Sequence, residues 1–528
     1  MSSIENPILP GYHPDPCMIR VGEDYYIATS TFEWFPGVQI HHSKDLINWK
    51  LVSYPLTRPS QLDMDGNIDS GGVWAPALSY SEGMFYLIYT DVKSRRGAFK
   101  DTHNYMVTSE NITGPWSDPI YLNSSGFDPS LFHDEDGSKW VLNMIWDHRK
   151  GTNSFAGIAL QEYSVAEKKL VGPVRNIFKG TDLGVTEAPH IYKRNGRYYL
   201  VTAEGGTVYN HAVTIARSDD LTGPYTVDPQ NPVLTSDRTQ HDMLQKAGHA
   251  SLVETQTGEW FMAHLCARPV KDGKCILGRE TALQKCYWTD DGWLRVEGGP
   301  HPKTTVPAPE LALFPFEQED SIDEFNGSHL NLHWNALRRP FTEDWVSLQE
   351  RDNHLRLKGQ ESMSSLHKQS LVARRLESFQ VNVETKVDFH PDHFQQMAGL
   401  IFYYNTTDYV YLRITHDEAD GLVLGIIQTK HGEYDEILQE DISLPEAPYY
   451  YLKAVLNNEW LTFYYSLDGE TWHLVAQGIE ITHLSDDDAD LIRFTGTFVG
   501  MCAQDLSGQS KHADFDYFMY QELPQPQA

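Results

Sequence analysis

Apolar and aromatic residues in the first half of the chain fall into five copies of one short pattern. Each copy runs from a Pro, or a Ser in the last copy, through a few apolar residues to a Gly-containing turn and then to an aromatic segment. Two short apolar segments joined in this way are typical of a β-hairpin. The copies cover residues 13–30, 74–90, 127–144, 187–203 and 249–265.

The spacing of the copies indicates a repeat architecture. Aligned on Pro16, Pro76, Pro129, Pro189 and Ser251, they lie 60, 53, 60 and 62 residues apart. A period of this length accommodates four short strands with their loops, which is the size of one propeller blade. Hardly any segment before residue 300 has a sustained helical stripe, so the pattern favours an all-β fold. We predict a five-bladed β-propeller in which the first strand of each copy lines a central channel.

The pattern changes near residue 315, and this change predicts a second domain. Residues 297–320 are rich in Pro and free of the repeat, as expected for a linker. The segments that follow alternate apolar and polar residues over longer strands with tight turns, which is typical of a two-sheet, jelly-roll-like β-sandwich. A chain of 528 residues also exceeds what one hydrophobic core usually serves. We expect a propeller domain over 1–314 and a sandwich domain over 315–528.

Composition excludes several classes of partner. The formal net charge of −31 argues against nucleic acid and against an anionic membrane surface. The five cysteines are widely spread and lack metal-ligand spacing, so we interpret them as reduced thiols. The N-terminal segment has neither a basic region nor an apolar core of a signal peptide, and no long apolar run occurs elsewhere. A cytoplasmic location is therefore the expectation.

Three of the five copies carry a carboxylate at their head, namely Asp15, Asp128 and Glu187. An acid beside a Pro at the start of a strand usually serves as a turn or cap residue. The repetition favours another interpretation, because a propeller would gather all three side chains in one channel. There, mutual repulsion and desolvation would raise some of their pKa values. Either a bound metal ion or acid–base chemistry would explain such a cluster.

The motifs around these acids strongly resemble glycoside hydrolase family 43, most closely its two-domain β-xylosidases. The resemblance implies a propeller with the active site at the funnel mouth and a C-terminal β-sandwich that helps to close the pocket. It covers nearly the whole chain through HPDP (13–16), GVWAPALS (72–79), GFDPS (126–130), NMIWDHR (143–149), TEAPH (186–190), QKAGHASLVET (245–255), LGRETALQK (277–285) and FTGTFVGMCAQDLSG (494–508).

This resemblance assigns a role to each acid. Asp15 is expected to be the general base, Glu187 the general acid, and Asp128 the third carboxylate that orients the acid and raises its pKa. Glycoside hydrolysis needs two carboxylates in any case, one to protonate the leaving oxygen and one to activate water or to attack directly. The family inverts the anomeric centre, which requires roughly 6.5–9.5 Å between the two carboxyl groups.

The resemblance also implies residues that bind the sugar. Phe32, Trp74 and Trp146 match the aromatic wall of the pocket, although each could instead be a core residue of a blade. Arg279 matches the arginine that binds substrate hydroxyls, a task that suits its forked guanidinium, with an ordinary surface arginine as the alternative. Phe498 resembles the phenylalanine that reaches across the domain interface, which would block one end of the channel and imply exo action.

His249 is the remaining candidate. It is interpreted as filling, in the fifth copy, the slot that Glu187 fills in the fourth. There it could hold a water molecule beneath the base or ligate a calcium or other divalent cation on the propeller axis. A buried, hydrogen-bonded histidine without a metal is the alternative. We expect that no cofactor is required, and His249 is the one residue named as a candidate metal ligand.

Taken together, the sequence predicts an inverting, exo-acting β-D-xylosidase that releases xylose from the non-reducing ends of xylobiose and xylo-oligosaccharides. Side activity on α-L-arabinofuranosides is expected by resemblance. The alternatives are an enzyme that acts mainly on α-L-arabinofuranosides and a non-catalytic carbohydrate-binding protein. A retaining fructosidase would need a Glu-Cys pair, where this chain has Glu187-Ala188. We also expect a homo-oligomer, either a dimer or a tetramer.

Overall fold

The computed structural model describes residues 2–237, 244–488 and 493–524. The chain forms two compact units. The propeller unit comprises Met1–Arg268 and Arg279–Phe316, and the sandwich unit comprises Pro269–Gly278 and Glu317–Ala528. The sequence placed a single domain boundary near residue 315. No sequence pattern indicated that the short segment Pro269–Gly278 would fold with the second unit.

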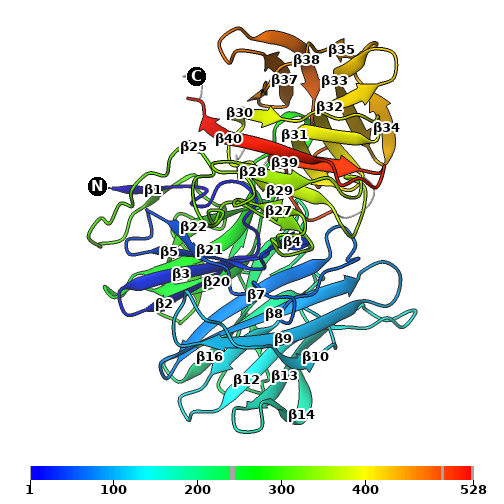
Figure 1. Cartoon of the computed structure of the whole chain (residues 1–528). Helices are drawn as coiled ribbons and strands as arrows, with labels where there is room; N and C mark the ends of the chain where they lie inside the picture. The colour runs from blue at the N-terminus through cyan, green and yellow to red at the C-terminus, as the bar shows by residue number, and fades with distance from the viewer. Residues whose placement is uncertain (1, 238–243, 489–492, 525–528) are drawn as a thin grey trace. The chain divides into compact units, whose positions relative to one another are not determined.

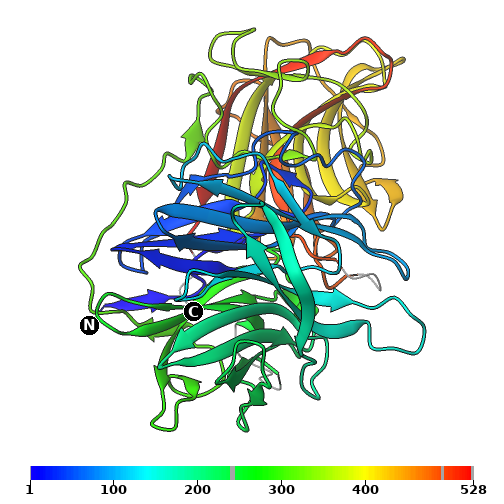
Figure 2. The ribbon, with the colours of Figure 1, turned by 90° about the horizontal axis from the view of Figure 1, so that it is seen from below.

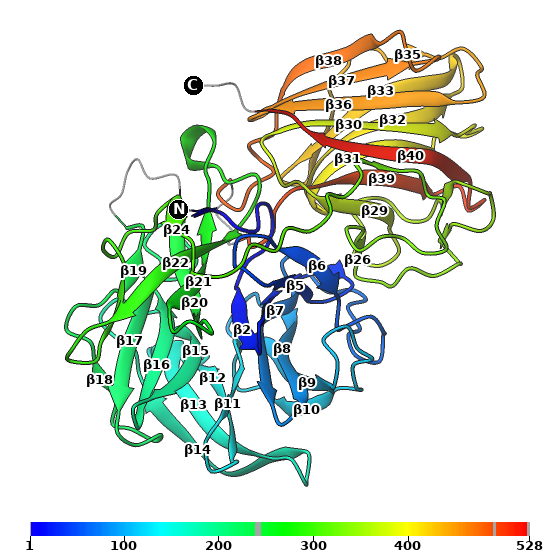
Figure 3. The ribbon, with the colours of Figure 1, turned by 90° about the vertical axis from the view of Figure 1, so that its left-hand side faces the viewer.

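Five antiparallel sheets make up the propeller blades, and their strands follow one another in chain order, except that the last strand of the fourth sheet pairs with the third strand of that sheet (Figure 3). The first two sheets contain β2 (Cys17–Val21), β3 (Asp24–Thr29), β5 (Gln39–Ser43) and β6 (Lys50–Ser53), then β7 (Gly72–Ser81), β8 (Met84–Ser94), β9 (Asp101–Ser109) and β10 (Ile120–Asn123). The third contains β11 (Ser130–His133), β12 (Lys139–Trp146), β13 (Phe155–Ser164) and β14 (Lys169–Phe178). The last two contain β15 (Glu187–Arg194), β16 (Arg197–Glu204), β17 (Ala212–Ser218), β18 (Thr226–Val227) and β19 (Leu234–Thr235), then β20 (Gln245–Glu254), β21 (Trp260–Ala267), β22 (Glu280–Trp288) and β23 (Leu294–Val296).

The innermost strands close a ring. Strands β2, β7, β11, β15 and β20 contact one another in that order, and β20 contacts β2 again. Apolar side chains from neighbouring sheets pack between the blades. One such cluster joins the first three sheets and includes Ala28, Leu87, Ile88, Leu131 and Val141. These observations confirm the predicted five-bladed propeller.

The two ends of the propeller unit meet beside the fifth blade. Strand β1 (Ser3–Glu5) pairs with β24 (Thr305–Pro307), and Leu9 forms a bridge with Thr281. The side-chain amide of Asn6 donates to the carbonyl oxygens of Leu283 and Lys303. The ring is therefore closed by hydrogen bonds between the start and the end of the unit.

The sandwich unit consists of two antiparallel sheets (Figure 1, Figure 2). One contains β25 (Ile322–Asp323), β27 (Val346–Ser347), β28 (Leu355–Lys358), β30 (Gln380–Asp388), β36 (Tyr450–Asn457), β37 (Trp460–Ser466), β38 (His473–Glu480) and β40 (His512–Glu522). The other contains β29 (Ser370–Arg375), β31 (Gln396–Asn405), β32 (Asp408–Asp417), β33 (Gly421–Lys430), β34 (Glu433–Glu436), β35 (Ile442–Ser443) and β39 (Phe498–Asp505).

Strict alternation of side chains explains how these sheets stack. In β30 every second residue is buried, as the sequence pattern predicted for a strand with one face on a core. The buried residues of both sheets join one large apolar cluster that includes Val383, Leu400, Leu412 and Leu452. The predicted β-sandwich is confirmed. Within the described parts of the chain, no helix has the length and apolar character needed to cross a membrane.

Candidate active site

Every inner strand of the propeller carries a left-handed kink near its start. The residues with positive φ there are Asp15 (57°), Ala75 (33°), Asp128 (54°), Ala188 (51°) and His249 (46°). Strand pairing shifts at three of these kinks, as expected for a β-bulge that redirects neighbouring side chains. Positive φ is uncommon for residues other than Gly and often marks a functional site. The five blades therefore repeat one irregular backbone feature around the ring.

Register around these kinks corrects the expected position of His249. Glu187 pairs with Ala203 and is one residue before the kink, whereas Gly248, which pairs with Leu265, takes that position in the fifth blade. His249 is the kink residue and so corresponds to Asp15 and Asp128. The expectation that His249 fills the slot of Glu187 is wrong, because the fifth copy lacks the Pro that follows the kink in the other four.

Asp15 is buried among groups that stabilise its charge. The Ser30 hydroxyl donates to its Oδ2 at 2.6 Å, and Arg279 Nη1 donates to its Oδ1 at 3.0 Å. His249 Nδ1 lies 3.6 Å from the same Oδ1. Burial alone would raise the pKa of Asp15, but Arg279, His249 and the Ser30 hydrogen bond outweigh it and lower the pKa. Asp15 is therefore ionised at neutral pH.

Asp128 and Glu187 are also buried, but with the opposite consequence. Burial and the negative charge of Asp15 raise the pKa of Asp128 to about 8. Burial together with the charges of Asp128 and Asp15 raises the pKa of Glu187 well above its usual range. The backbone N–H of Ala188 also donates to the Asp128 carboxylate and so links the two acids. The pair retains a proton at neutral pH.

The three predicted acids thus form one electrostatically coupled cluster with divided protonation. One carboxylate is ionised and can accept a proton, while a neighbouring pair can donate one. Two titratable groups whose surroundings shift their pKa values in opposite directions are the arrangement needed for paired acid and base catalysis. The cluster therefore has the equipment for acid–base chemistry.

Aromatic rings line up beside the acids. The ring centroid of Trp74 lies 6.0 Å from that of Phe32 and 5.3 Å from that of Phe127, and Phe127 lies 6.5 Å from Trp146. The indole N–H groups of Trp74 and Trp146 donate to the carbonyl oxygens of Ser70 and Ala98, which fixes both rings. The three predicted aromatic residues are therefore brought together, with Phe127 between Trp74 and Trp146.

Arg279 is not a surface residue, because only 1% of it is exposed. Its guanidinium carbon lies 5.3 Å from the centroid of the Phe32 ring, and its backbone carbonyl accepts a hydrogen bond from the His13 N–H at 2.9 Å. Its charge lowers the pKa values of Asp15, Asp128 and Glu187 alike. Arg279 is therefore the cation of the carboxylate cluster.

Comparison with known proteins agrees with this geometry. The family model described as "Glycosyl hydrolases family 43" matches residues 4–294, and "Beta xylosidase C-terminal Concanavalin A-like domain" matches residues 322–521. The chain belongs to glycosyl hydrolase family 43.

Similar proteins in the family match over nearly the full chain. A "Beta-xylosidase" of Bacillus subtilis is 53% identical, covering 98% of this chain and 99% of its own. A "Xylosidase/arabinosidase 43B" of Humicola insolens is 48% identical, covering 100% and 99%. The crystal structure of a xylan β-1,4-xylosidase from Bacillus halodurans is 62% identical, with a TM-score of 0.98, and covers 98% of this chain and 100% of its own.

Three further residues of the site had not been singled out from the sequence. Ser30 holds Asp15, Phe127 lies between two predicted aromatic residues, and the Lys100 ammonium lies 4.3 Å from the Trp146 ring centroid. Lys100 also lowers the pKa of Glu187 through its charge. Phe127 lies inside the family 43 motif GFDPS and could have been found there, whereas Lys100 has no motif around it.

Phe498 belongs to the sandwich unit. It is the first residue of β39 and is fully buried, and the guanidinium carbon of Arg375 lies 5.1 Å from its ring centroid. The part that Phe498 was expected to play in closing the sugar pocket stays a prediction.

The residues around His249 do not by themselves provide a calcium site. Calcium takes six to eight oxygen ligands. The carboxylate oxygen beside His249 already accepts from Arg279, and the charge of Arg279 disfavours a second cation there. Burial and Arg279 lower the pKa of His249 despite the opposing effect of Asp15. A neutral, buried histidine is what this arrangement favours, and any axial cation would need ligands beyond these side chains.

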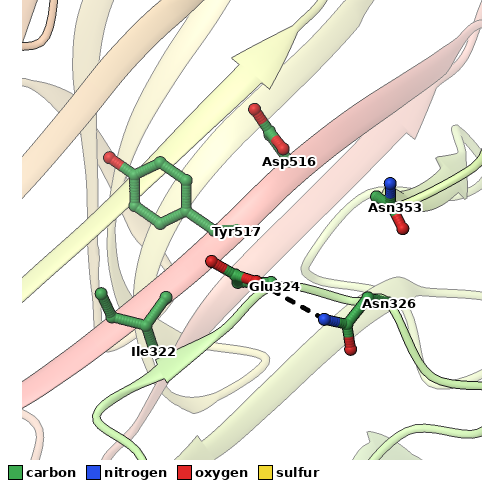
Figure 4. A pocket seen from close by; sticks show the side chains of 6 residues that line it. All are labelled: Ile322, Glu324, Asn326, Asn353, Asp516 and Tyr517. Carbon is green, nitrogen blue, oxygen red and sulfur yellow. Dashed lines mark hydrogen bonds between the residues drawn. The ribbon is translucent and has the colours of Figure 1, made fainter.

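A separate groove of about 500 Å³ lies in the sandwich unit (Figure 4). Its lining consists of Ile322, Glu324, Asn326, Asn353, Asp516 and Tyr517. Lys386 pairs with Asp516, and the Tyr517 hydroxyl donates to Glu384 at 2.5 Å. These partners already satisfy the polar groups of the groove that lie on β40, and we assign the groove no role.

Proposed function

We propose that this family 43 protein is an inverting, exo-acting β-D-xylosidase that releases xylose from the non-reducing ends of xylobiose and xylo-oligosaccharides. The observation that carries the proposal is the buried carboxylate cluster, in which the pKa of Asp15 is lowered while those of Asp128 and Glu187 are raised. The full-length similarity to proteins named as β-xylosidases supports the choice of sugar.

In the proposed mechanism, ionised Asp15 accepts a proton from a water molecule as that water attacks the anomeric carbon. Protonated Glu187 donates its proton to the leaving glycosidic oxygen. Asp128 keeps the pKa of Glu187 high, because two buried carboxyl groups so close together cannot both ionise, and it accepts a hydrogen bond from the residue that follows Glu187. Because water attacks directly, no covalent sugar–enzyme intermediate forms.

Substrate binding is proposed to use the remaining site residues. The rings of Phe32, Trp74 and Trp146 can pack against the apolar C–H faces of a sugar, while Arg279 can donate to its hydroxyls. Because Arg279 also holds Asp15, a sugar bound by Arg279 would lie beside the base. His249 is proposed to hold Asp15 in position, because its Nδ1 lies beside the carboxylate oxygen that also accepts from Arg279.

Product analysis on β-1,4-xylobiose tests both the sugar and the stereochemistry. Proton NMR during the first minutes should show α-xylose appearing before mutarotation, because inversion converts the β linkage into an α product. Asp15→Ala should release no xylose and serves as the control. Initial release of β-xylose would contradict inversion, and absence of any release by the unaltered protein would favour a non-catalytic binding protein.

An enzyme acting mainly on α-L-arabinofuranosides is the second candidate. It is favoured by the name of the Humicola insolens relative, which includes both activities. Paired assays on the aryl β-D-xyloside and the aryl α-L-arabinofuranoside separate the two candidates. A higher kcat/KM for the xyloside is the expected result, with measurable activity on the arabinofuranoside. The same assay on 1,3-linked xylobiose tests the linkage.

Three further expectations belong to the proposal. We propose a cytoplasmic location. We also propose a homo-oligomer, either a dimer or a tetramer, and sedimentation analysis of the purified chain would test the oligomeric state. We also propose that no cofactor is required for turnover. Activity should therefore survive dialysis against a chelator, and its loss with recovery on adding calcium would instead show that turnover requires a divalent cation.

A further inference from the structure

The segment immediately before Arg279 does not fold with the propeller. The chain leaves the propeller unit after Arg268 and returns at Arg279. This excursion, Pro269–Gly278, belongs to the sandwich unit. The two ends of this excursion are tied within the propeller, because Arg268 donates to both carboxylate oxygens of Glu280 at 2.7 Å. The Gly11 N–H also donates to Glu280, at 2.8 Å. The excursion thus starts and ends at one fixed place on the fifth blade.

Apolar anchoring holds the excursion in the sandwich unit. Ile276 and Leu277 are fully buried and belong to the large core cluster of that unit. The Thr497 N–H donates to the Ile276 carbonyl oxygen at 3.1 Å. The two residues that precede Gly278 are therefore held by the sandwich core.

Polar contacts add to this anchoring along the same segment. Lys274 Nζ donates to the Asp487 carbonyl oxygen at 2.5 Å and lies 3.0 Å from Asp488 Oδ1. The Cys275 N–H donates to the Ser485 hydroxyl oxygen at 3.1 Å. The excursion is therefore held by the Lys274 side chain and by the backbone of Cys275 and Ile276.

Gly278 makes the tightest contact. Its φ is 76°, and a Cβ atom added there would lie 2.7 Å from the Gly496 Cα and 2.9 Å from the Thr495 carbonyl oxygen. Such distances leave no room for a side chain. The next residue in the chain is Arg279, whose guanidinium donates to Asp15. The backbone that carries the site cation is thus constrained directly on its N-terminal side.

We propose that Pro269–Gly278 is a positioning segment, whose anchoring in the sandwich core by Ile276 and Leu277 sets the backbone of Arg279 and hence the Arg279–Asp15 contact. The sandwich domain would then be needed for catalysis through the covalent chain itself, whether or not it contributes a side chain to the sugar pocket. The inference rests on the proposed function, because it assumes that Asp15 acts as the base.

The test compares Leu277→Ala with Leu452→Ala. Both leucines are fully buried in the same apolar cluster, but Leu452 lies in β36, outside the excursion. Both variants should lose thermal stability. Only Leu277→Ala should lower kcat/KM for the aryl xyloside by 10-fold or more beyond the loss seen in the control. Leu277→Met, which keeps most of the buried volume, should restore activity.

The pH profile gives a readout that a purely structural role would not change. Asp15 is faced by Arg279, His249, His211, Asp128 and Glu187, and by the Ser30 hydroxyl. Of these, only Arg279 is directly preceded by the excursion. A displaced Arg279 guanidinium lowers the pKa of Asp15 less. The acid limb of the pH profile of kcat/KM should therefore move to higher pH, as it should also in Arg279→Ala.

Three outcomes decide the matter. The inference holds if Leu277→Ala moves the acid limb, Leu452→Ala does not, and Leu277→Ala adds no further loss when combined with Arg279→Ala. Ile276→Val, which removes one methylene from the same buried anchor, provides a milder second variant should Leu277→Ala fold poorly, with a shift in the same direction expected. An unmoved acid limb in every folded excursion variant overturns the inference. If Arg279→Ala itself keeps full activity, the proposed site is wrong instead.

Discussion

Asp15 and Asp128 have the same side chain on equivalent backbone kinks, yet their pKa values move in opposite directions. Asp15 accepts hydrogen bonds from Arg279 and Ser30, whereas Asp128 has the charge of Asp15 nearby and the Ala188 N–H as its donor. Both are buried, so desolvation does not distinguish them. At the scale of the single residue, the neighbouring charges decide which carboxylate is a base and which retains a proton.

Replacing the proposed acid should separate substrates by their leaving group. Glu187→Ala should lower kcat on xylobiose by roughly 10²–10⁴-fold, because the sugar alkoxide leaves poorly without a proton. An aryl xyloside with an activated phenolate should lose much less activity, since that group leaves without protonation. Steady-state kinetics on both substrates provide the measurement. Equal losses on the two would show that Glu187 is not the general acid.

Asp128→Asn should stabilise the protein while lowering its activity. The pKa of Asp128 is raised from 3.8 to about 8 in the folded state, so between these pH values the folded protein binds more protons than the unfolded chain. The contribution of Asp128 to the free energy of unfolding therefore falls as pH rises from about 4 to 8. Asparagine carries no charge at any of these pH values, so the variant does not lose stability in this way.

The melting temperature of Asp128→Asn should accordingly exceed that of the unaltered protein by a few degrees at pH 8, with a smaller difference at pH 5. Thermal unfolding at both pH values checks this. A difference that is the same at pH 5 and pH 8 would mean that Asp128 is ionised in both states.

At the scale of the element, the kinked inner strand is the unit that presents the acids. The kink recurs in all five blades, although only the first and third place a carboxylate on it. Glu187 lies one residue earlier, at the position that Trp74 and Phe127 hold in their own blades. The repeated backbone feature therefore explains how acids and aromatic rings from separate blades reach one cluster.

Gly126 offers a test of this geometry, because it precedes Phe127 and Asp128. A Cβ atom at Gly126 would lie 1.8 Å from the Met144 carbonyl oxygen, so Gly126→Ala must displace the strand start. We expect a loss of about 1–3 kcal/mol in the free energy of unfolding and at least a 10-fold lower kcat/KM.

Gly137→Ala is the matched control in the same blade. Gly137 has a positive φ, 88°, but an added Cβ atom there meets nothing within 4 Å. This variant should lose some stability through backbone strain and keep its activity. Urea unfolding and aryl xyloside kinetics on both variants provide the comparison. Similar activity in the two would show that the strand start tolerates displacement.

At the scale of the whole molecule, closure of the ring depends on contacts between the two ends of the propeller unit. Asn6 donates to the Leu283 and Lys303 carbonyl oxygens at 2.7 and 2.8 Å and accepts from the Leu283 N–H at 2.8 Å. A propeller has no covalent link at this position, so hydrogen bonds and buried residues such as Ile4 must hold it.

Asn6→Ala should weaken this closure. The loss of three hydrogen bonds predicts a cost of about 2–4 kcal/mol in the free energy of unfolding. Ser3→Ala is the control, because the Ser3 hydroxyl only donates to exposed Glu5. Asn6→Ala should melt at a lower temperature than Ser3→Ala, and limited proteolysis should cleave it sooner. An unchanged melting temperature would mean that the ring closes through β1 and β24 alone.

The amino-acid sequence by itself determined the five hairpin repeats, the sandwich that follows them, and the three acids with Arg279 and the aromatic residues. These follow from short-range periodicity and from motifs, both of which are written in consecutive residues. The tertiary structure decided the register of His249, the recruitment of Lys100 and Ser30, the protonation of each acid, and the folding of Pro269–Gly278 with the sandwich unit. The reason is that charges and contacts between distant segments set these properties, and no local pattern records them.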